Sequence, residues 1–394
     1  MEEDGMMGKW TGFEGVLQEA VPACAPALVC RVEQAGVCLY EGAFGWLDPE
    51  KHSRPVQVDS PFDLASVTKL FTATAFLRLV DRGLAALDQP LAAVLPEFGG
   101  MRPIGGAEDP LAKTPLAGDP RRAGEWVDAG RVTFRHLLTH TSGLPAWRSV
   151  YAQCGPPPHL PLNENELDQR QGLALAALVS YPFVAQPGES YLYSDTGLLL
   201  LGFAVARLSG YGRLDRALGA LVCQPLGLSA RFCPVPDEWE RIVPTEACAW
   251  RERRLVGEVH DENAAGMGGV AGHAGLFATA ADVCRLGRLF LNGGEGLLSP
   301  GLVAQGIREQ HASAEGIRRG LGWQLRSDPN PTCSTAFSGS SFGHTGFTGT
   351  SLWCDPARAL CVALLTNRVY HGRDARRIIA LRPRVHQAIA QLLG

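Results

Sequence analysis

A serine and a lysine three residues apart have the types and spacing for acyl transfer. Ser66 and Lys69 lie at the start of a predicted helix over 66–82, and residues three apart on a helix share a face. A lysine buried in apolar surroundings has a lowered pKa, so its neutral form can accept the serine proton. The backbone N–H of Ser66, at the helix start, is free to bind a developing oxyanion. The alternative is a helix N-cap followed by a solvated lysine.

Two later segments supply possible partners for this serine. Residues 191–195 lie between a Pro-Gly pair and an apolar helix, which predicts a loop that the fold can direct into a cleft. Tyr193 in this loop could share a proton with Ser66. Residues 343–347 are predicted to begin a strand, where a glycine lets substrate approach the backbone and the N–H of Phe347 serves as second oxyanion donor.

The remaining pattern predicts how these segments are positioned. Apolar segments over 28–33 and 37–44 flank a Gln-Ala-Gly turn and indicate a hairpin, and strand-like segments return near the end of the chain over 348–353 and 360–366. Residues 99–130 are rich in Gly, Pro and charge and indicate a long irregular excursion. Helical periodicity is found elsewhere, over 66–82, 135–139, 172–180, 196–208, 279–291 and 373–393.

Strands at both ends of the chain, with helices between them, predict a mixed α/β (α+β) fold. We expect an antiparallel sheet built from both termini, flanked by helices, with a large and mostly helical lobe inserted in the middle. The chain would form one catalytic unit over 1–394. Its sheet part would comprise about 10–65 and 315–394, and its helical lobe about 66–314.

Composition limits the partners and the compartment. The 394 residues carry a formal net charge of -4, mixed along the chain, so no basic face for nucleic acid is expected. The acidic start, residues 1–4, does not resemble an export signal, and the apolar run 198–206 is too short to span a membrane. The 11 cysteines include no Cys-x-x-Cys pair. We therefore expect a cytoplasmic protein with reduced thiols, no metal and no cofactor, although an exported mature form would look the same.

In this order, the motifs resemble those of the family of class C β-lactamases, low-molecular-mass penicillin-binding proteins and the related family VIII-type esterases. Besides Ser66 to Lys69, residues 193–195 stand where the family has Tyr-x-Asn, and 344–346 stand where it has Lys-Thr-Gly. Residues 133–145 match a helix-and-turn signature that is common in the family. The resemblance spans about 15–390 and is specific to the family, not to a substrate.

The resemblance implies a role for each matching residue. Ser66 would be the nucleophile, Lys69 its activator and Tyr193 the proton carrier for acylation and deacylation. The N–H groups of Ser66 and Phe347 would form the oxyanion hole. The substrate would contact the remaining motif residues, which are Asp195, His344, Thr345 and Gly346.

Two departures from the family pattern affect the expected substrate. Asp195 replaces the family asparagine and places a carboxylate near Lys69, which favours a protonated lysine and shifts proton transfer toward Tyr193. His344 replaces the lysine that helps to bind substrate carboxylates in the family, and a histidine is mostly neutral near pH 7. Both changes disfavour anionic substrates, and esterases similar to this family often carry His or Trp at the second position.

Several other patterns carry weaker functional hypotheses. Residues 339–343 spell Gly-x-Ser-x-Gly, but a strand rather than a helix is predicted to follow. His136 and His140 lie four apart like zinc ligands, without the Glu between them or a third ligand, which favours structural histidines. Glycines over 266–275 lack the Lys-Ser/Thr of a phosphate loop and indicate a tight connection beside the cleft.

Two further groups stay ambiguous at the level of sequence. The polar residues 260–263 could contact substrate, although a solvated turn is the favoured interpretation. Trp323 and Phe342 fit the wall of an acyl pocket and the packing of a core equally well.

Three functional hypotheses follow, with a small-molecule ester, amide or lactam as substrate in the first two. The favoured one is a carboxylesterase-like hydrolase that forms an acyl-Ser66 intermediate from small, weakly charged esters. The second is a D-Ala-D-Ala carboxypeptidase or β-lactamase. The third is a binding protein that retains the fold without catalysis, which the intact Ser66, Lys69 and Tyr193 disfavour. The sequence does not indicate an oligomeric state.

Overall fold

The computed structural model describes residues 2–159 and 161–394, so Met1, part of the acidic start considered above, lies outside the described residues. Its main element is an antiparallel sheet of eight strands in the order β12-β13-β14-β15-β16-β17-β1-β2. The strands are β1 Ala27–Gln34, β2 Val37–Gly45, β12 His311–Ala312, β13 Arg318–Arg319, β14 Gln324–Leu325, β15 Phe342–Thr345, β16 Ser351–Asp355 and β17 Leu360–Thr366.

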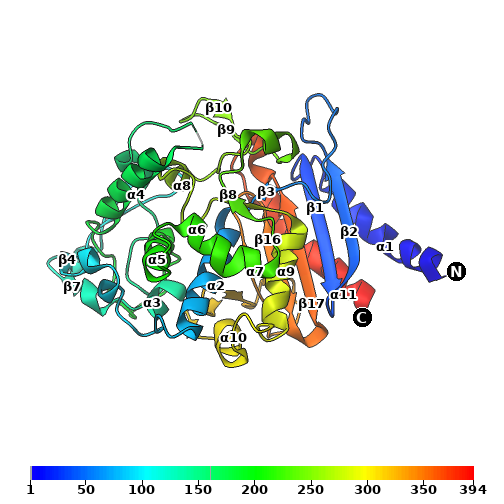
Figure 1. Ribbon diagram of the computed structural model, residues 1–394. Helices are drawn as coiled ribbons and strands as arrows, with labels where there is room; N and C mark the ends of the chain where they lie inside the picture. Colours follow the sequence, from blue (N-terminus) through cyan, green and yellow to red (C-terminus); the bar gives the residue numbers. More distant parts are fainter. Residues whose placement is uncertain (1, 160) are drawn as a thin grey trace.

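Helices cover both faces of this sheet (Figure 1). Every residue of β17 is buried, as expected of a strand with apolar side chains on both faces. Leu360, Val362 and Leu364 pack with α1 Glu2–Glu19 and α11 Arg376–Leu393, whereas the alternate residues of β17 pack with α9 Ala280–Leu291. The predicted fold class is therefore confirmed, with strands from both ends of the chain in one sheet.

The middle of the chain is mostly helical and lies on the α9 side of the sheet (Figure 1). Helix α2, Thr68–Asp81, is its centre, because eleven of its residues are buried, including Lys69. The other helices of this part are α3 Phe134–Leu138, α4 Glu164–Leu178, α5 Asp195–Leu208, α6 Leu214–Leu218, α7 Gln224–Leu226, α8 Glu262–Gly266 and α10 Pro300–Ile307.

Short strand pairs complete the fold. The predicted irregular excursion over 99–130 contains two small ribbons, β4 Met101–Pro103 with β7 Trp126–Asp128, and β5 Ala107–Glu108 with β6 Pro115–Leu116. A third ribbon joins β9 Ala247–Cys248 to β10 Arg253–Arg254. A three-stranded sheet then brings distant segments together, with β11 Leu276–Ala278 between β3 Phe62–Asp63 and β8 Arg231–Phe232.

Several expected elements differ from those of the structure, and the strand expected over 348–353, for example, is β16 at Ser351–Asp355. Residues 343–347 were expected to begin a strand, but β15 ends at Thr345, because the backbone then turns tightly with Gly346 N–H donating to Thr350 O at 2.7 Å. Helix α4 begins at Glu164, earlier than the expected 172, because Asn163 caps a polar and exposed first turn. Helix α1 was not expected, since its sequence has weak apolar periodicity. Among the described residues, none of the helices combines the length and apolar content that crossing a membrane requires.

Candidate active site

The turn before Ser66 is fixed by three surrounding segments. Leu64 N–H donates to Leu276 O of β11 at 2.9 Å, and Leu64 O accepts from the Thr350 hydroxyl at 2.8 Å. The Asp63 carboxylate accepts from Ala65 N–H at 2.9 Å. Ala65 itself has φ +46°, a left-handed conformation that costs free energy for a residue with a Cβ. Ser66 follows in a 3₁₀ turn over 65–67, where the first N–H groups have no carbonyl partner within the turn.

Lys69 lies directly against Ser66 and is fully enclosed. Its Nζ donates to Ser66 Oγ at 2.7 Å and to the backbone oxygen of His273 at 3.1 Å. The same Nζ lies 2.8 Å from an oxygen of Asp195 and 5.1 Å from the centre of the Tyr193 ring. The structure thus brings the four residues predicted from separate motifs into one cluster.

The charges in this cluster oppose the effect of burial on Lys69. Burial lowers the pKa of Lys69, but the Asp195 carboxylate and the Tyr193 oxygen outweigh it, and the net pKa is raised. The net pKa of Tyr193 is raised, because burial and the Asp195 charge outweigh the lowering effect of Lys69 and of contacts with Lys69 and Ser66. Lys69 is therefore a protonated partner of Asp195, which agrees with the expected effect of Asp195 and not with a simple desolvated lysine.

The loop that carries Tyr193 is fastened to the helix-and-turn segment 133–145. The backbone N–H of Leu192 donates to His140 O at 2.9 Å, and that of Asp195 donates to Ala146 O at 2.9 Å. Ser194 N–H donates to His140 Nδ1 at 3.1 Å, and burial keeps the pKa of His140 well below its usual value, so the ring is neutral and can accept. The ring centres of His140 and Tyr193 lie 4.6 Å apart.

The end of β15 forms the opposite side of the site. Gly346 is required by close approach, since a Cβ there would lie 2.1 Å from Thr350 Oγ1 and 2.5 Å from Leu64 O. The next residue, Phe347, is held by Arg368, whose Nε donates to Phe347 O at 2.7 Å and whose guanidinium lies 4.3 Å from the ring centre. Its N–H therefore has a fixed position beside the Ser66 turn.

His344 is buried and uncharged. Its Nδ1 donates to Thr345 O at 2.9 Å, which leaves Nε2 as an acceptor, and no described group donates to it. Burial, with smaller contributions from Arg319 and Lys69, keeps the pKa of His344 well below its usual value. The cation of the family lysine is thus absent from β15.

Two cavities meet at Ser66, and both are lined by Ser66, Tyr193 and Phe347. The larger, of about 710 Å³, lies toward β15 and includes Arg319 and the predicted substrate contacts His344, Thr345 and Gly346. The smaller, of about 320 Å³, lies toward α5 and α8 and includes Asp195. Its apolar surface comes from several segments, namely Pro110, Leu111, Ala146, Trp147 and Ala274.

The interpretation of residues 260–263 as a solvated turn is wrong, because ion pairs from distant segments cover them. His260, Glu262 and Asn263 are buried. His260 Nε2 lies 3.0 Å from Glu246, and Asp261 lies 2.9 Å from His273 Nε2. Three of the four residues line the smaller cavity, as the alternative of a substrate contact requires.

The other weak patterns have structural roles. His136 Nδ1 accepts from Thr133 N–H at 3.2 Å and caps α3. Ser341 of the Gly-x-Ser-x-Gly pattern is buried and precedes β15, not a helix. Trp323 and Phe342 are buried, with ring centres 4.9 Å apart, and belong to the core.

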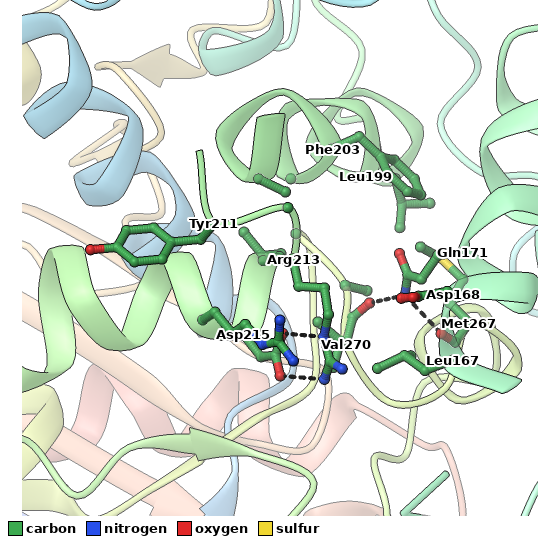
Figure 2. Close-up of a pocket in the computed structure, with 17 residues that line it drawn as sticks. Leu167, Asp168, Gln171, Leu199, Phe203, Tyr211, Arg213, Asp215, Met267 and Val270 are labelled. Carbon is green, nitrogen blue, oxygen red and sulfur yellow. Dashed lines mark hydrogen bonds and ion pairs between the residues drawn. The ribbon is translucent and has the colours of Figure 1, made fainter. Parts of the chain in front are cut away.

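A further cavity of about 380 Å³ lies apart from Ser66, between α4, α5 and residues 267–272 (Figure 2). Its polar groups are partly paired, since Arg213 contacts Asp215 at 2.7 Å and Gln171 donates to the backbone of 267–270. The segment 267–272 leads into His273, whose carbonyl holds Lys69. It packs closely on α5, because a Cβ on Gly272 would lie 2.2 Å from Leu198 O. The predicted tight connection beside the cleft is therefore present.

Comparisons with known proteins agree with this architecture. Esterase EstB of Burkholderia gladioli is 34% identical over 95% of this chain and 93% of its own. A protein of Escherichia coli (strain K12), provisionally named a D-alanyl-D-alanine carboxypeptidase, is 29% identical over 93% of this chain and 83% of its own.

Solved structures with less similar sequences share the fold. EstCE1, described as a hydrolase with promiscuous acyltransferase activity, has a TM-score of 0.72 at 23% identity, covering 97% of this chain and 99% of its own. A penicillin-binding protein homologue from Caulobacter crescentus has a TM-score of 0.69 at 20% identity, covering 98% and 97%. The family model described as Beta-lactamase matches residues 25–385. This chain therefore belongs to the β-lactamase family and is a serine hydrolase with that fold.

Proposed function

We propose that this protein is a carboxylesterase-like hydrolase that forms an acyl-enzyme on Ser66 from small, weakly charged esters. The observation that carries the proposal is the cluster at Ser66, where a buried amine lies 2.7 Å from the hydroxyl and the Tyr193 phenol adjoins both. A nucleophile, a proton acceptor and a fixed cation within contact distance are what acyl transfer to a serine needs.

The proton path runs through Tyr193. Because Lys69 is held protonated by Asp195, it acts as a cation that stabilises the Tyr193 phenolate. The phenolate takes the proton from Ser66 as Oγ bonds to the ester carbonyl carbon, and then gives that proton to the departing alkoxide. In deacylation, Tyr193 takes a proton from water, hydroxide adds to the acyl carbon, and the proton returns to Ser66 Oγ as the carboxylic acid leaves.

The negative charge on the carbonyl oxygen is stabilised by backbone donors. We assign the N–H groups of Ser66 and Phe347 to this role, because the first sits in the free part of a 3₁₀ turn and the second is anchored by Arg368.

The walls of the site favour esters over anionic lactams. His344 stands neutral where the family lysine binds a carboxylate. The smaller cavity, with Trp147, Leu111 and Phe347, offers an apolar space of about 320 Å³ for a short acyl group. In this arrangement Asp195 orients Lys69, and Thr345, Gly346 and the His344 ring line the side where the alcohol leaves.

A direct comparison of substrates tests the proposal. Purified protein is expected to hydrolyse p-nitrophenyl butyrate at least tenfold more efficiently in kcat/KM than nitrocefin, and intact-mass analysis should find one fluorophosphonate adduct, on Ser66. Ser341→Ala, which alters the unrelated Gly-x-Ser-x-Gly serine, should label normally. Preference for nitrocefin would instead support the carboxypeptidase or β-lactamase alternative, which the 29% identical relative favours.

A further inference from the structure

Arg319 is a buried cation in the larger cavity that no sequence motif indicates. It lies on β13, is 6% exposed and lines the 710 Å³ cavity together with Ser66 and Tyr193. Its Nε and Nη2 both donate to the Tyr191 hydroxyl, at 3.0 and 2.6 Å. Register pairing with His311 of β12 and Gln324 of β14 fixes its place at this edge of the sheet.

The charge of Arg319 is not neutralised by a partner. Among the side chains that the structure describes, no carboxylate lies within ion-pair distance of it, and its Nη1 has no hydrogen-bond acceptor. A buried charge without a counter-ion is costly, so its retention points to a function. The titratable side chains that face it are not carboxylates but tyrosines and histidines, namely Tyr191, Tyr193, His140, His311 and His344.

The nearest group whose charge changes in the reaction is Tyr193. The Arg319 guanidinium carbon lies 5.5 Å from the centre of the Tyr193 ring. Burial lowers the pKa values of His344 and His140, and the charge of the same guanidinium lowers them further. Nη1 is closed off from solvent, so that atom acts through its field rather than by touching substrate.

We propose that Arg319 is a positioning residue that supplies a positive charge from β13 and favours the deprotonated form of Tyr193. The proposal rests on the proposed function, in which the Tyr193 phenolate takes the Ser66 proton.

The two other charges beside Tyr193 act on its pKa in opposite directions. Lys69 and Asp195, 2.8 Å apart, have opposite effects on the phenol, and Ser66 is uncharged. Arg319 is an additional cation near the ring, and it comes from a different element, β13. A unit charge at such a distance shifts a titration by about one to two pH units at an effective dielectric constant near 20.

Replacing the charge tests the proposal. Arg319→Met should shift the rising limb of the kcat/KM–pH profile for p-nitrophenyl butyrate upward by about one to two pH units, because the phenolate loses its stabilising cation. Arg319→Lys, which keeps the charge but loses the double donation to Tyr191, should return most of the shift. Arg318→Met, the neighbouring residue whose side chain pairs with Glu309 at the surface, is the matched control and should leave the profile unchanged.

A spectroscopic readout separates this proposal from the proposed function. The difference in tyrosinate absorbance between each protein and its Tyr193→Phe derivative follows the titration of Tyr193 without any substrate. The difference titration should move upward in Arg319→Met even if the preferred substrate is not an ester. An unshifted titration in a folded Arg319→Met protein would overturn the proposal. So would a KM increase confined to carboxylate-bearing esters with an unshifted profile, since that would make Arg319 a substrate anchor.

Discussion

The two cavities that meet at Ser66 treat buried charge in opposite ways. Around the smaller cavity ionisable side chains occur in contact pairs, which are Lys69 with Asp195, His273 with Asp261, His260 with Glu246, and Arg373 with Glu246 and Glu262. In the larger cavity, Arg319 has no carboxylate partner among the described residues, and His344 is neutral. The wall of the smaller cavity, here the paired wall, thus holds its ionisable side chains in contacts. The wall of the larger cavity, the unpaired wall, keeps Arg319 without a carboxylate partner among the described residues.

This difference suggests a division of labour. Contact pairs hold segments together, and the pairs made by Lys69 and Arg373 join parts of the chain that are far apart in sequence. An unpaired cation stabilises no particular segment, but it does stabilise any negative charge that forms nearby during the reaction. The paired wall would then shape the acyl pocket, whereas the unpaired wall would set the acidity of the phenol.

The largest expected effect comes from removing the Ser66 hydroxyl, which lies where the two cavities meet. Ser66→Ala should lower ester turnover by roughly 10⁴-fold or more, because no acyl-enzyme can form. The change deletes one hydroxyl, so the melting temperature should stay close to that of wild type. Steady-state kinetics with thermal melting measures both, and residual turnover near the wild-type rate would assign the nucleophile to another residue.

Tyr193→Phe removes the phenol hydroxyl whose deprotonated form Arg319, on the unpaired wall, is proposed to favour. Turnover should fall by roughly 10² to 10⁴, the usual contribution of a general acid–base group. Tyr211→Phe is the matched control, since Tyr211 is exposed beside the cavity behind α5. An unchanged rate in Tyr193→Phe would remove the phenol from the mechanism.

Glu246→Gln breaks two contacts of the paired wall and should affect stability. Burial raises the pKa of Glu246, but His260 and Arg373 outweigh it and hold the value at about 2. A depressed carboxyl pKa stabilises the fold above the unfolded value near 4.3 and loses that contribution as pH falls toward 2. The free energy of unfolding should drop by about 2 kcal/mol at pH 7.

Denaturant unfolding at pH 7 and pH 3 measures this effect. The gap between wild type and Glu246→Gln should narrow at the lower pH, because at pH 3 the Glu246 carboxyl is already largely protonated in the unfolded chain but not in the native protein. Glu309→Gln, at an exposed pair with Arg318, should cost less than about 1 kcal/mol. Equal losses at both pH values would show that Glu246 contributes through packing and not through its charge.

The smallest effect is expected where the paired wall touches Lys69. Asp195→Asn restores the family residue and removes the carboxylate 2.8 Å from Nζ, so the pKa of Lys69 should fall by about one to three units. NMR of protein with ¹³C-labelled lysine follows this titration, with Lys69→Met to assign the signal. If the titration does not move, Asp195 does not set the charge state of Lys69.

Sequence reasoning worked best where the geometry is local. Ser66 and Lys69 meet because they are one helical turn apart, and the effect of Asp195 on Lys69 follows from its charge alone. Arg319 was missed because β13 is two residues long and reaches Tyr193 only through the order of strands in the sheet. His273 was missed because it contributes a backbone carbonyl, which any residue type can supply.

The fold class was predictable for a related reason. Alternating apolar strands at both ends of the chain specify one sheet, whatever lies between them. The buried cluster 260–263 could not be predicted, because its burial depends on Glu246, Arg373 and Lys113 arriving from distant loops. The polarity of residues 260–263, taken alone, indicated a turn exposed to solvent.

The contact of Gly272 with α5 lies outside the cleft but affects the position of the Lys69 amine. Gly202 and Gly272 touch backbone to backbone. Even one methyl group at either position would therefore push α5, which carries Asp195, away from the segment that carries His273. Asp195 and His273 both contact Lys69, Asp195 through its carboxylate and His273 through its backbone carbonyl. Random mutagenesis that alters activity should therefore also select substitutions at Gly202 and Gly272. There the added side-chain volume, rather than a new chemical group, would change the activity.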